Sequence, residues 1–276
     1  GRTAKALSLG NGHTCAILDD DTIKCWGGGN YIGYGDTTQR EAPDATAVVN
    51  LGSGRTAKAL SLGNGHTCAI LDDDTLKCWG YGGQGQLGTG DTSWRGHTAG
   101  EMGDALLAIN LGSGRTAKVV SAGYQHTCAI LDDDTLKCWG VNDYSQLGYG
   151  DTNNRGDAAG EMGDLLLAIN LGSGRTAKVV SAGYYHTCAI LDDDTLKCWG
   201  RNTNGQLGYG DATSRTAPEA TAVVNLGAGR TAKAVSTGSS HTCALLDDDT
   251  LKCWGDNIYG RVGVGSSDEL IWDPTE

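Results

Sequence analysis

The sequence predicts an all-β fold: a β-propeller of five near-identical blades, each of three to four antiparallel strands with an intra-blade disulfide. A fifteen-residue phrase, HTCAILDDDTLKCWG in its second copy, occurs five times with only Ile/Leu exchanges. The copies are 53 to 60 residues apart, a period typical of repeat architectures. The 276 residues include 44 Gly and 3 Pro, as expected of short strands joined by turns. The five copies start at His13, His66, His126, His186 and His241.

The repeated phrase is predicted to form a β-hairpin. Its apolar and polar positions alternate at period two, and its three aspartates are a turn signal. Pairing Cys68 with Cys78 leaves residues 72–74 as the loop. Both faces of such a hairpin are largely apolar, which favours blades covered by two neighbours over a stacked solenoid with polar caps. One face carries His66, Cys68, Ile70, Leu76 and Cys78, and the other carries Thr67, Ala69, Leu71, Lys77 and Trp79.

A longer string, G-x-x-HTCA-[IL]-L-x-D-x-T-L-KCWG followed by N-x-x-GQLG-x-GD, is seen whole between Gly183 and Asp211. It resembles the repeat of the regulator of chromosome condensation family of β-propellers, of the bacterial type with cysteine-containing repeats. The resemblance covers nearly the whole chain and implies a propeller, typically of seven blades. The chain departs from the family where a hairpin glycine is expected, because each copy has aspartate there: Asp21, Asp74, Asp134, Asp194 and Asp249.

We expect one repeat domain over residues 1–276, with blades at about 1–51, 52–111, 112–171, 172–226 and 227–276. Short apolar stretches such as AVVNLG are expected to be the outer strand of each blade, but the last copy has none. Three arrangements stay open: residues 270–272 replace that strand, a ring closes without it, or an arc closes by pairing with another chain.

The ten cysteines form five C-x9-C pairs, and the hairpin register places each pair directly opposite on neighbouring strands. Cross-strand disulfides are therefore predicted, which indicates an oxidising compartment: secreted, periplasmic or cell surface. A metal site using the nearby histidine is the alternative, but the spacing matches no familiar zinc pattern and supplies three ligands rather than four. We expect no metal and no cofactor. The predicted disulfide residues are Cys15, Cys25, Cys68, Cys78, Cys128, Cys138, Cys188, Cys198, Cys243 and Cys253.

The other constant residues are also expected to be structural. Each repeat histidine should be buried and hydrogen-bonded, and each tryptophan should pack against the disulfide face of the neighbouring blade. The fifteen aspartates of the turns should pair with the ten basic residues of the GRTAK segments in a solvated charge ring, since the loop lacks the spacing of a hand-type calcium site. Only His97 lies outside the repeated His and Cys positions, and the sequence identifies no partner for it. No catalytic residue is predicted, and the chain is not expected to be an enzyme.

The copies differ just before each histidine and just after each CWG. In an up-and-down blade both segments lie at one end, so this variable-loop rim is expected to carry recognition on a constant scaffold. The net charge of −12 disfavours nucleic acid, and no apolar run approaches the ~18 residues of a membrane span. The family's exchange activity on a small GTPase is not expected here, because the chain is acidic and its cysteines predict disulfides.

The predicted function is a non-catalytic, secreted or surface-exposed scaffold that binds protein through its tyrosine-rich variable-loop rim. Two alternatives stay open: a lectin-like propeller that binds carbohydrate, and a recently amplified or engineered propeller with no dedicated ligand. The candidate rim residues are Asn11, Tyr31, Asn64, Tyr81, Tyr124, Gln125, Tyr144, Tyr184, Tyr185, Arg201, Ser239, Ser240 and Tyr259.

Overall fold

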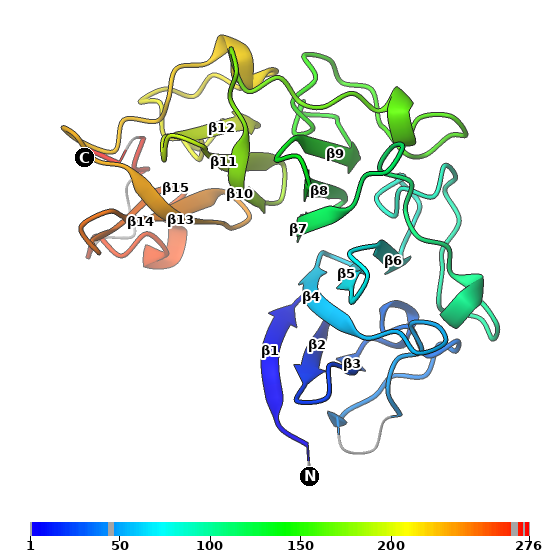
Figure 1. The fold of residues 1–276 in the computed structure, drawn as a ribbon. Helices are drawn as coiled ribbons and strands as arrows, with labels where there is room; N and C mark the ends of the chain where they lie inside the picture. The colour runs from blue at the N-terminus through cyan, green and yellow to red at the C-terminus, as the bar shows by residue number, and fades with distance from the viewer. Residues whose placement is uncertain (1, 44–46, 266–269, 273, 276) are drawn as a thin grey trace. The chain divides into compact units, whose positions relative to one another are not determined.

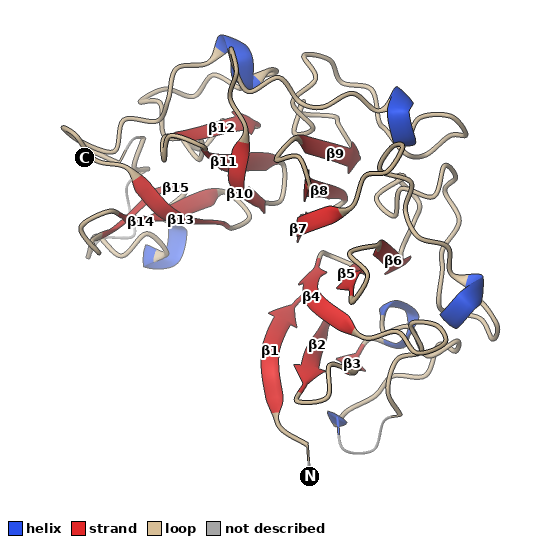
Figure 2. Ribbon diagram, in the orientation of Figure 1, coloured by secondary structure: helices blue, strands red, loops and turns tan. Residues whose placement is uncertain are grey.

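The computed structural model describes residues 2–43, 47–265, 270–272 and 274–275, and it is all-β with five three-stranded antiparallel sheets (Figures 1 and 2). Each sheet is one blade, numbered 1 to 5 along the chain, so the predicted fold class is confirmed. The strands are β1 (Ala4–Leu9), β2 (His13–Leu18) and β3 (Ile23–Gly27); β4 (Ala57–Leu62), β5 (His66–Leu71) and β6 (Leu76–Gly80); β7 (Ala117–Ala122), β8 (His126–Leu131) and β9 (Leu136–Gly140); β10 (Ala177–Ala182), β11 (His186–Leu191) and β12 (Leu196–Gly200); β13 (Ala232–Thr237), β14 (His241–Leu246) and β15 (Leu251–Gly255).

Short 3-10 turns follow the third strand of the blades: η1 (Gly29–Tyr31), η3 (Gly103–Ala105), η4 (Gly163–Leu165), η5 (Pro218–Ala220) and η6 (Ile258–Gly260). The chain divides into two compact units. The first contains residues 1–133, 139–141 and 154–167, and the second contains residues 134–138, 142–153 and 168–276.

The predicted hairpin register is confirmed. In blade 2, Cys68 lies opposite Cys78 and Ile70 lies opposite Leu76. The loop closes where the Leu71 amide donates to the Thr75 carbonyl at 2.9 Å. Asp74 has a φ of 63°, in the left-handed region that most side chains avoid but Asp tolerates better than most. Aspartate therefore takes the conformation for which the family resemblance led us to expect glycine.

The fourth strand is only rudimentary. The outer stretches are not strands: that of blade 2 keeps one hydrogen bond to the third strand, from the Ile109 amide to the Leu76 carbonyl at 2.7 Å. A separate isolated bridge joins the end of β6 to the following loop, between Gly80 and Arg95. In blade 5 the corresponding bridge joins Gly255 and Ile271, so residues 270–272 replace the bridging arginine segment and not the outer stretch.

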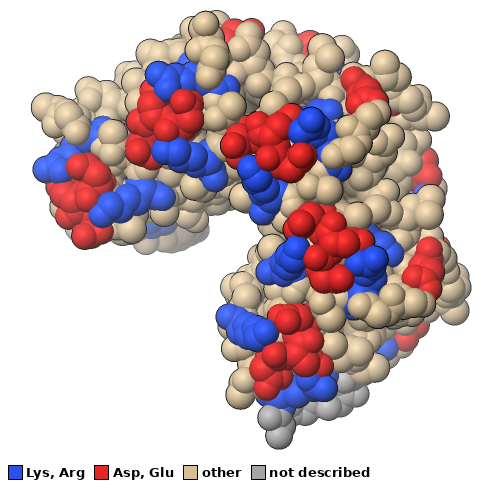
Figure 3. Space-filling model, in the orientation of Figure 1, with Lys and Arg blue, Asp and Glu red and all other residues tan. Residues whose placement is uncertain are grey.

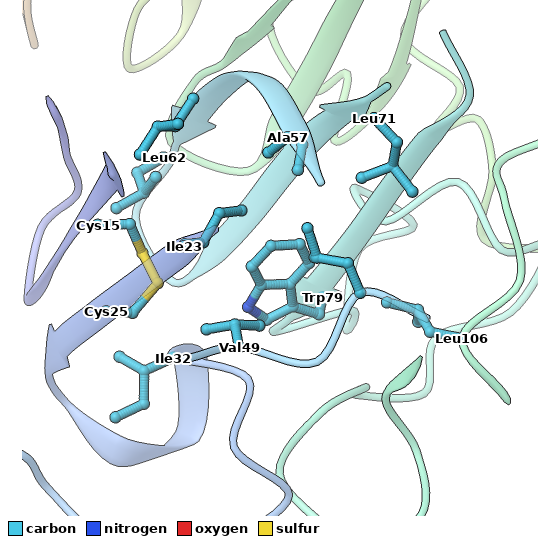
Figure 4. Packing of buried hydrophobic residues seen from close by; sticks show 13 residues of the cluster. Cys15, Ile23, Cys25, Ile32, Val49, Ala57, Leu62, Leu71, Trp79 and Leu106 are labelled. Carbon is cyan, nitrogen blue, oxygen red and sulfur yellow. A yellow bond between two sulfur atoms is a disulfide. The ribbon is translucent and has the colours of Figure 1, made fainter. Parts of the chain in front are cut away.

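Each unit has a buried hydrophobic core between successive blades, blades 1 and 2 in the first unit and blades 4 and 5 in the second. The buried cluster between blades 1 and 2 brings Trp79 of β6 against Cys15 and Cys25, with Leu62 of β4 beside them (Figure 4). In the second unit Trp254 packs in the same way with the cysteines of blade 4. The prediction that each indole packs against the disulfide face of the neighbouring blade is confirmed for these two pairs of blades. Burying an indole stabilises each contact by about 2–3 kcal/mol.

The glycine three residues before a repeat histidine makes room for the imidazole ring, as Gly63 does for His66. A Cβ added to Gly63 would lie 2.3 Å from Cε1 of His66 and 2.4 Å from the Gly123 carbonyl oxygen. We predict that Gly63→Ala lowers the free energy of unfolding by about 2–3 kcal/mol, because the rigid ring and the backbone cannot both move away. Gly12→Ala is the matched control in a urea titration, since nothing lies within 4 Å of its added Cβ. Equal losses in the two variants would contradict this account.

Candidate functional site

The repeat histidines are structural, as predicted. Nε2 of His66 lies 2.9 Å from Oγ1 of Thr127 in the next blade, and His13 and Thr67 repeat the contact at 2.8 Å. Thr127 donates its hydroxyl proton to the Gln86 carbonyl at 2.8 Å, so the histidine must be the donor to the threonine and carries its proton on Nε2. Burial lowers the pKa of His66 to about 3 and that of His13 to about 4. A buried, neutral imidazole with so low a pKa does not act as a general base near neutral pH.

The cysteines are disulfide-bonded as predicted, and no described cysteine is free. The Cα atoms of Cys68 and Cys78 are 4.1 Å apart, as expected for a directly opposed cross-strand pair. Cys128 and Cys138 are also disulfide-bonded. The other bonds are Cys15–Cys25, Cys188–Cys198 and Cys243–Cys253.

The hairpin-loop end of each blade carries compact charge clusters in which acidic side chains lie beside basic ones (Figure 3). In blade 2, Arg55 contacts Asp72 at 3.0 Å and Asp73 at 2.8 Å, while Lys58 contacts Asp74 at 2.7 Å. All five side chains are well exposed to solvent, so each pair contributes about 0–1 kcal/mol. In the part of the chain that the structure describes, no group of three His, Cys, Asp or Glu side chains is arranged to hold a metal ion.

The opposite, variable end of the first unit carries an aromatic cluster. The rings of Tyr81 and Trp94 meet edge to face with centroids 5.1 Å apart, and Tyr31 lies 6.3 Å from Trp94. His97 continues the row, 5.9 Å from Trp94. All four side chains are partly exposed. We call Tyr31, Tyr81, Trp94 and His97 the first aromatic cluster.

Three blades build the pocket at this cluster. Tyr31 comes from η1 of blade 1, and its carbonyl accepts a hydrogen bond from Oγ1 of Thr67 at 3.3 Å. An isolated β-bridge pairs Gly80 with Arg95. Tyr81 directly follows Gly80 and Trp94 directly precedes Arg95, so the bridge places these two side chains next to each other. The resulting pocket has a volume of about 290 Å³ and is lined by Tyr31, Asn64, Gly65, Tyr81, Trp94 and Gln125.

A larger cavity of about 620 Å³ lies between the outer loops of blades 2 and 3 in the same unit. Its charged side chains already bind each other: the guanidinium of Arg95 contacts Asp91 at 2.6 Å. Much of the remaining lining is glycine, alanine and leucine. The smaller pocket is the better candidate site, because its lining offers a ligand the aromatic rings of Tyr31, Tyr81 and Trp94 together with the side-chain amides of Asn64 and Gln125.

The second unit has its own aromatic cluster at the variable end. The ring centroids of Tyr144 and Tyr185 are 4.7 Å apart, and those of Tyr184 and Tyr185 are 4.5 Å apart. The guanidinium of Arg201 lies 5.1 Å from the Tyr144 centroid, within the range of a cation–π contact. We call these four residues the second aromatic cluster.

The remaining candidate rim residues belong to neither aromatic cluster. The side chain of Asn11 donates to that of Asn64 at the edge of the first pocket. Tyr124 is partly buried, as is Ser240, whereas Ser239 is exposed. Tyr259 is 88% exposed, and its described ring contact is with Arg261 at 5.8 Å.

Sequence reasoning missed Trp94 and left His97 without a partner. Nδ1 of His97 lies 3.2 Å from Oε2 of Glu101. One signal could have identified Trp94: it stands directly before an arginine that recurs in four copies, at a position where the copies differ. The four residues at that position are Gln39, Trp94, Asn154 and Ser214.

Disulfide-bonded, three-stranded blades that pack on a neighbouring blade through tryptophan within each unit and bear variable loops at one end define a repeat protein of the β-propeller class. The chain belongs to the regulator of chromosome condensation (RCC1) repeat family. A model of that repeat matches just over half of the chain, at residues 4–32, 57–86, 118–146, 178–206 and 232–261, and a second model matches residues 193–245. The family resemblance seen in the sequence is therefore confirmed.

Several named proteins are similar to the chain. The ultraviolet-B receptor UVR8 of Arabidopsis thaliana is 31% identical over 98% of this chain and 57% of its own length. The human E3 ubiquitin-protein ligase HERC2 is 26% identical over 96% of this chain and 5% of its own length. The chain thus spans little more than half of the first relative and a small part of the second.

Two solved structures share the fold. Prp20p from Saccharomyces cerevisiae superposes with a TM-score of 0.79 at 21% identity, covering 99% of this chain and 63% of Prp20p. Human WBSCR16 superposes with a TM-score of 0.80 at 18% identity, covering 99% of this chain and 66% of that protein. At these identities the likeness concerns the fold alone.

Proposed function

We propose that this chain is a non-catalytic protein-binding module, secreted or exposed at a cell surface, that binds a protein through its variable-loop end. The observation that supports this most is the first aromatic cluster with its pocket. Partly exposed Trp and Tyr side chains, held by a rigid sheet scaffold, are the residues most enriched at the energetic centres of protein interfaces. The aromatic side chains of this cluster occupy positions at which the otherwise near-identical repeats differ.

The family supports a role in protein contact. Prp20p, the yeast RCC1, is described with its binding properties to Gsp1p and histones, and a second solved structure shows it bound to Kap60. Disulfides persist in oxidising compartments, which supports the extracellular part of the proposal. No helix in the described part of the chain is long and apolar enough to cross a membrane.

We predict that Trp94→Ala weakens binding of the partner by about 30-fold, the effect typical of a central interface tryptophan. The measurement is quantitative mass spectrometry of proteins retained from extracellular extract by the immobilised chain, followed by titration of the retained protein. Lys58→Ala at the opposite, charged end of the same blade is the matched control and should retain the same protein. Equal retention by the wild type and Trp94→Ala would count against the site, provided that urea titration shows both to be folded.

Carbohydrate is the second candidate ligand, because the first pocket combines aromatic faces with the amides of Asn64 and Gln125. Recurring sugar pockets would need similar residues in each blade, whereas the two aromatic clusters are composed differently. Saturable binding on a glycan array that is lost in Trp94→Ala would favour carbohydrate over protein. A chain that retains neither protein nor sugar would support the third alternative, a propeller without a dedicated ligand.

A further inference from the structure

A carboxylate of the chain itself fills a small polar site near the hairpin-loop end of blade 2. Oδ1 of Asp104 accepts the Ser53 amide proton at 2.9 Å, and Oδ2 accepts the Ser53 hydroxyl proton at 2.6 Å. These hydrogen bonds lower the pKa of Asp104, and the positive charge of Lys77 lowers it further. Blade 3 repeats both contacts between Ser113 and Asp164, at 2.8 and 2.5 Å. The chain thus builds the same carboxylate site twice.

Blade 4 carries a different pair of residues in place of Gly103 and Asp104. Gly103 has a φ of 72°, in the left-handed region, whereas the corresponding residue of η5 is Pro218, whose ring fixes φ near about −65°. The next residue, Glu219, is exposed, and in the described part of the chain no hydrogen bond joins it to Ser173. Because proline cannot take the conformation of Gly103, the acidic side chain of blade 4 is not directed back as Asp104 is.

A cavity of about 370 Å³ lies beside the serine of blade 4. In blade 2 a Cβ added to Gly52 would lie 2.8 Å from Oδ1 of Asp104. At Gly172, the same position in blade 4, an added Cβ would meet only Nζ of Lys197 within 4 Å, at 3.6 Å. The cavity therefore occupies the place of the blade 2 carboxylate. Its lining includes Gly172, Ser173, Arg175 and Lys197.

The donors at this cavity have hydrogen bonds left to give. Lys197 is 7% exposed, and the hydrogen bond described for its ammonium goes to the Pro218 carbonyl at 2.7 Å. Its counterpart Lys77 donates to two carbonyls, at 2.9 Å each. Among the described residues, neither the amide nor the hydroxyl of Ser173 has an acceptor. A ligand carboxylate would supply the missing acceptor.

The other charged groups at the cavity leave room for an anion. The guanidinium of Arg175 contacts Asp192 at 3.1 Å and Asp193 at 2.7 Å. The arginine of blade 2 makes the same two ion pairs while an aspartate occupies the site beside them. Glu219 is exposed, so water and salt screen its charge. These acidic side chains therefore do not prevent an anion from binding at Ser173.

We propose that blade 4 binds a carboxylate group of a ligand in this cavity. The amide and hydroxyl of Ser173 donate to the carboxylate oxygens, and the ammonium of Lys197 supplies the balancing positive charge. Such charge-assisted hydrogen bonds are stronger than those between neutral groups. This goes beyond the proposed function, because the cavity lies near the constant hairpin-loop end and not at the variable-loop rim. The carboxylate belongs either to an acidic residue of a protein or to a small free acid.

The probe is the blocked peptide acetyl-Gly-Asp-Gly-amide, titrated into the whole chain while the Ser173 amide is followed by proton–nitrogen NMR. In the wild type this signal should move to lower field and saturate with a Kd of about 1–10 mM, the range expected for one paired carboxylate. The same peptide with Asn in place of Asp should bind about tenfold more weakly or not at all. Ser173→Ala should weaken binding about tenfold, followed at the neighbouring amides. Blade 5 has Ala228 at this position, so the fold tolerates alanine.

The decisive variant is Pro218→Gly/Glu219→Asp, which restores the Gly-Asp pair of blades 2 and 3. Its own aspartate should then bind Ser173, and the peptide should no longer bind. Lys178→Ala is the matched control: Lys178 contacts Asp194 at 2.8 Å at the same end of the blade and does not line the cavity, so peptide binding should be unchanged.

A parallel titration with acetate identifies the source of the carboxylate. Acetate that binds as tightly as the peptide would support a small free acid, and tighter binding of the peptide would support an acidic residue of a protein. The proposal is overturned if the wild type shows no saturable shift with either probe, or if Pro218→Gly/Glu219→Asp binds as the wild type does. An equal loss of binding in Lys178→Ala and Ser173→Ala would also overturn it, since general attraction to positive charge would then explain the binding.

Discussion

Reduction of the disulfides is expected to unfold most of the chain at room temperature. Each bond closes a short loop with a sequence separation of 10, as between Cys68 and Cys78, which corresponds to about 2–3 kcal/mol of chain entropy removed from the unfolded state. The five bonds together thus contribute about 10–15 kcal/mol, comparable with the whole free energy of unfolding of a typical domain. The urea midpoint of the reduced, thiol-blocked chain, compared with that of the oxidised chain, measures the effect.

Variants that each lack one disulfide separate the entropy of loop closure from the packing of the sulfur atoms. The double substitution Cys68→Ala/Cys78→Ala removes a fully buried bond, whereas Cys243→Ala/Cys253→Ala removes a bond of equal loop length between two partly exposed cysteines. Both should lose about 2–3 kcal/mol from loop closure. The first should lose more, because the buried sulfurs leave a cavity beneath the next blade. An unchanged midpoint in both variants would refute the role given to the bonds.

The hairpins could be predicted from the sequence because their signals are local. Period-two alternation, the aspartate turn and the opposed cysteines all specify one register, so Cys68 opposite Cys78 followed directly. The packing of Trp79 on the preceding disulfide also followed, because a blade with two apolar faces must bury both. The outer strand was less predictable: the AVVNL-type stretches alternate like strands, yet in blade 2 the described backbone bond is the single one from Ile109 to Leu76.

The aromatic cluster could be predicted only in part. Tyr31 and Tyr81 were found because they lie in the segments where the copies differ. Trp94 was not, because its position depends on a bridge between Gly80 and Arg95 that leaves no periodic signal in a glycine-rich loop. Gln125 joins the pocket from a third blade, so the set as a whole is defined by packing between blades and not by any one repeat.

Acid should destabilise the chain through its buried histidines. The pKa of His66 is lowered to about 3 and that of His13 to about 4 by burial, whereas an unfolded histidine titrates near 6.5. Between these values the unfolded state binds more protons than the folded state. The free energy of unfolding therefore falls as pH drops below about 6.5, by about 1.4 kcal/mol per pH unit for each histidine, and it gains nothing from these groups above neutrality.

The first unit should accordingly lose about 3 kcal/mol per pH unit between about pH 6 and pH 4.5 from His13 and His66 together. Urea midpoints at pH 7, 6, 5 and 4.5 give the slope. His66→Gln should be less stable at pH 7, where it weakens the bond to Thr127, but its slope should be shallower by about 1.4 kcal/mol per pH unit. Leu107→Gln, at a non-titrating position that is 76% exposed, should keep the wild-type slope. If all three proteins had the same slope, the protons taken up on acid unfolding would belong to other groups, and the neutral histidine–threonine contact would not be what makes the blades acid-sensitive.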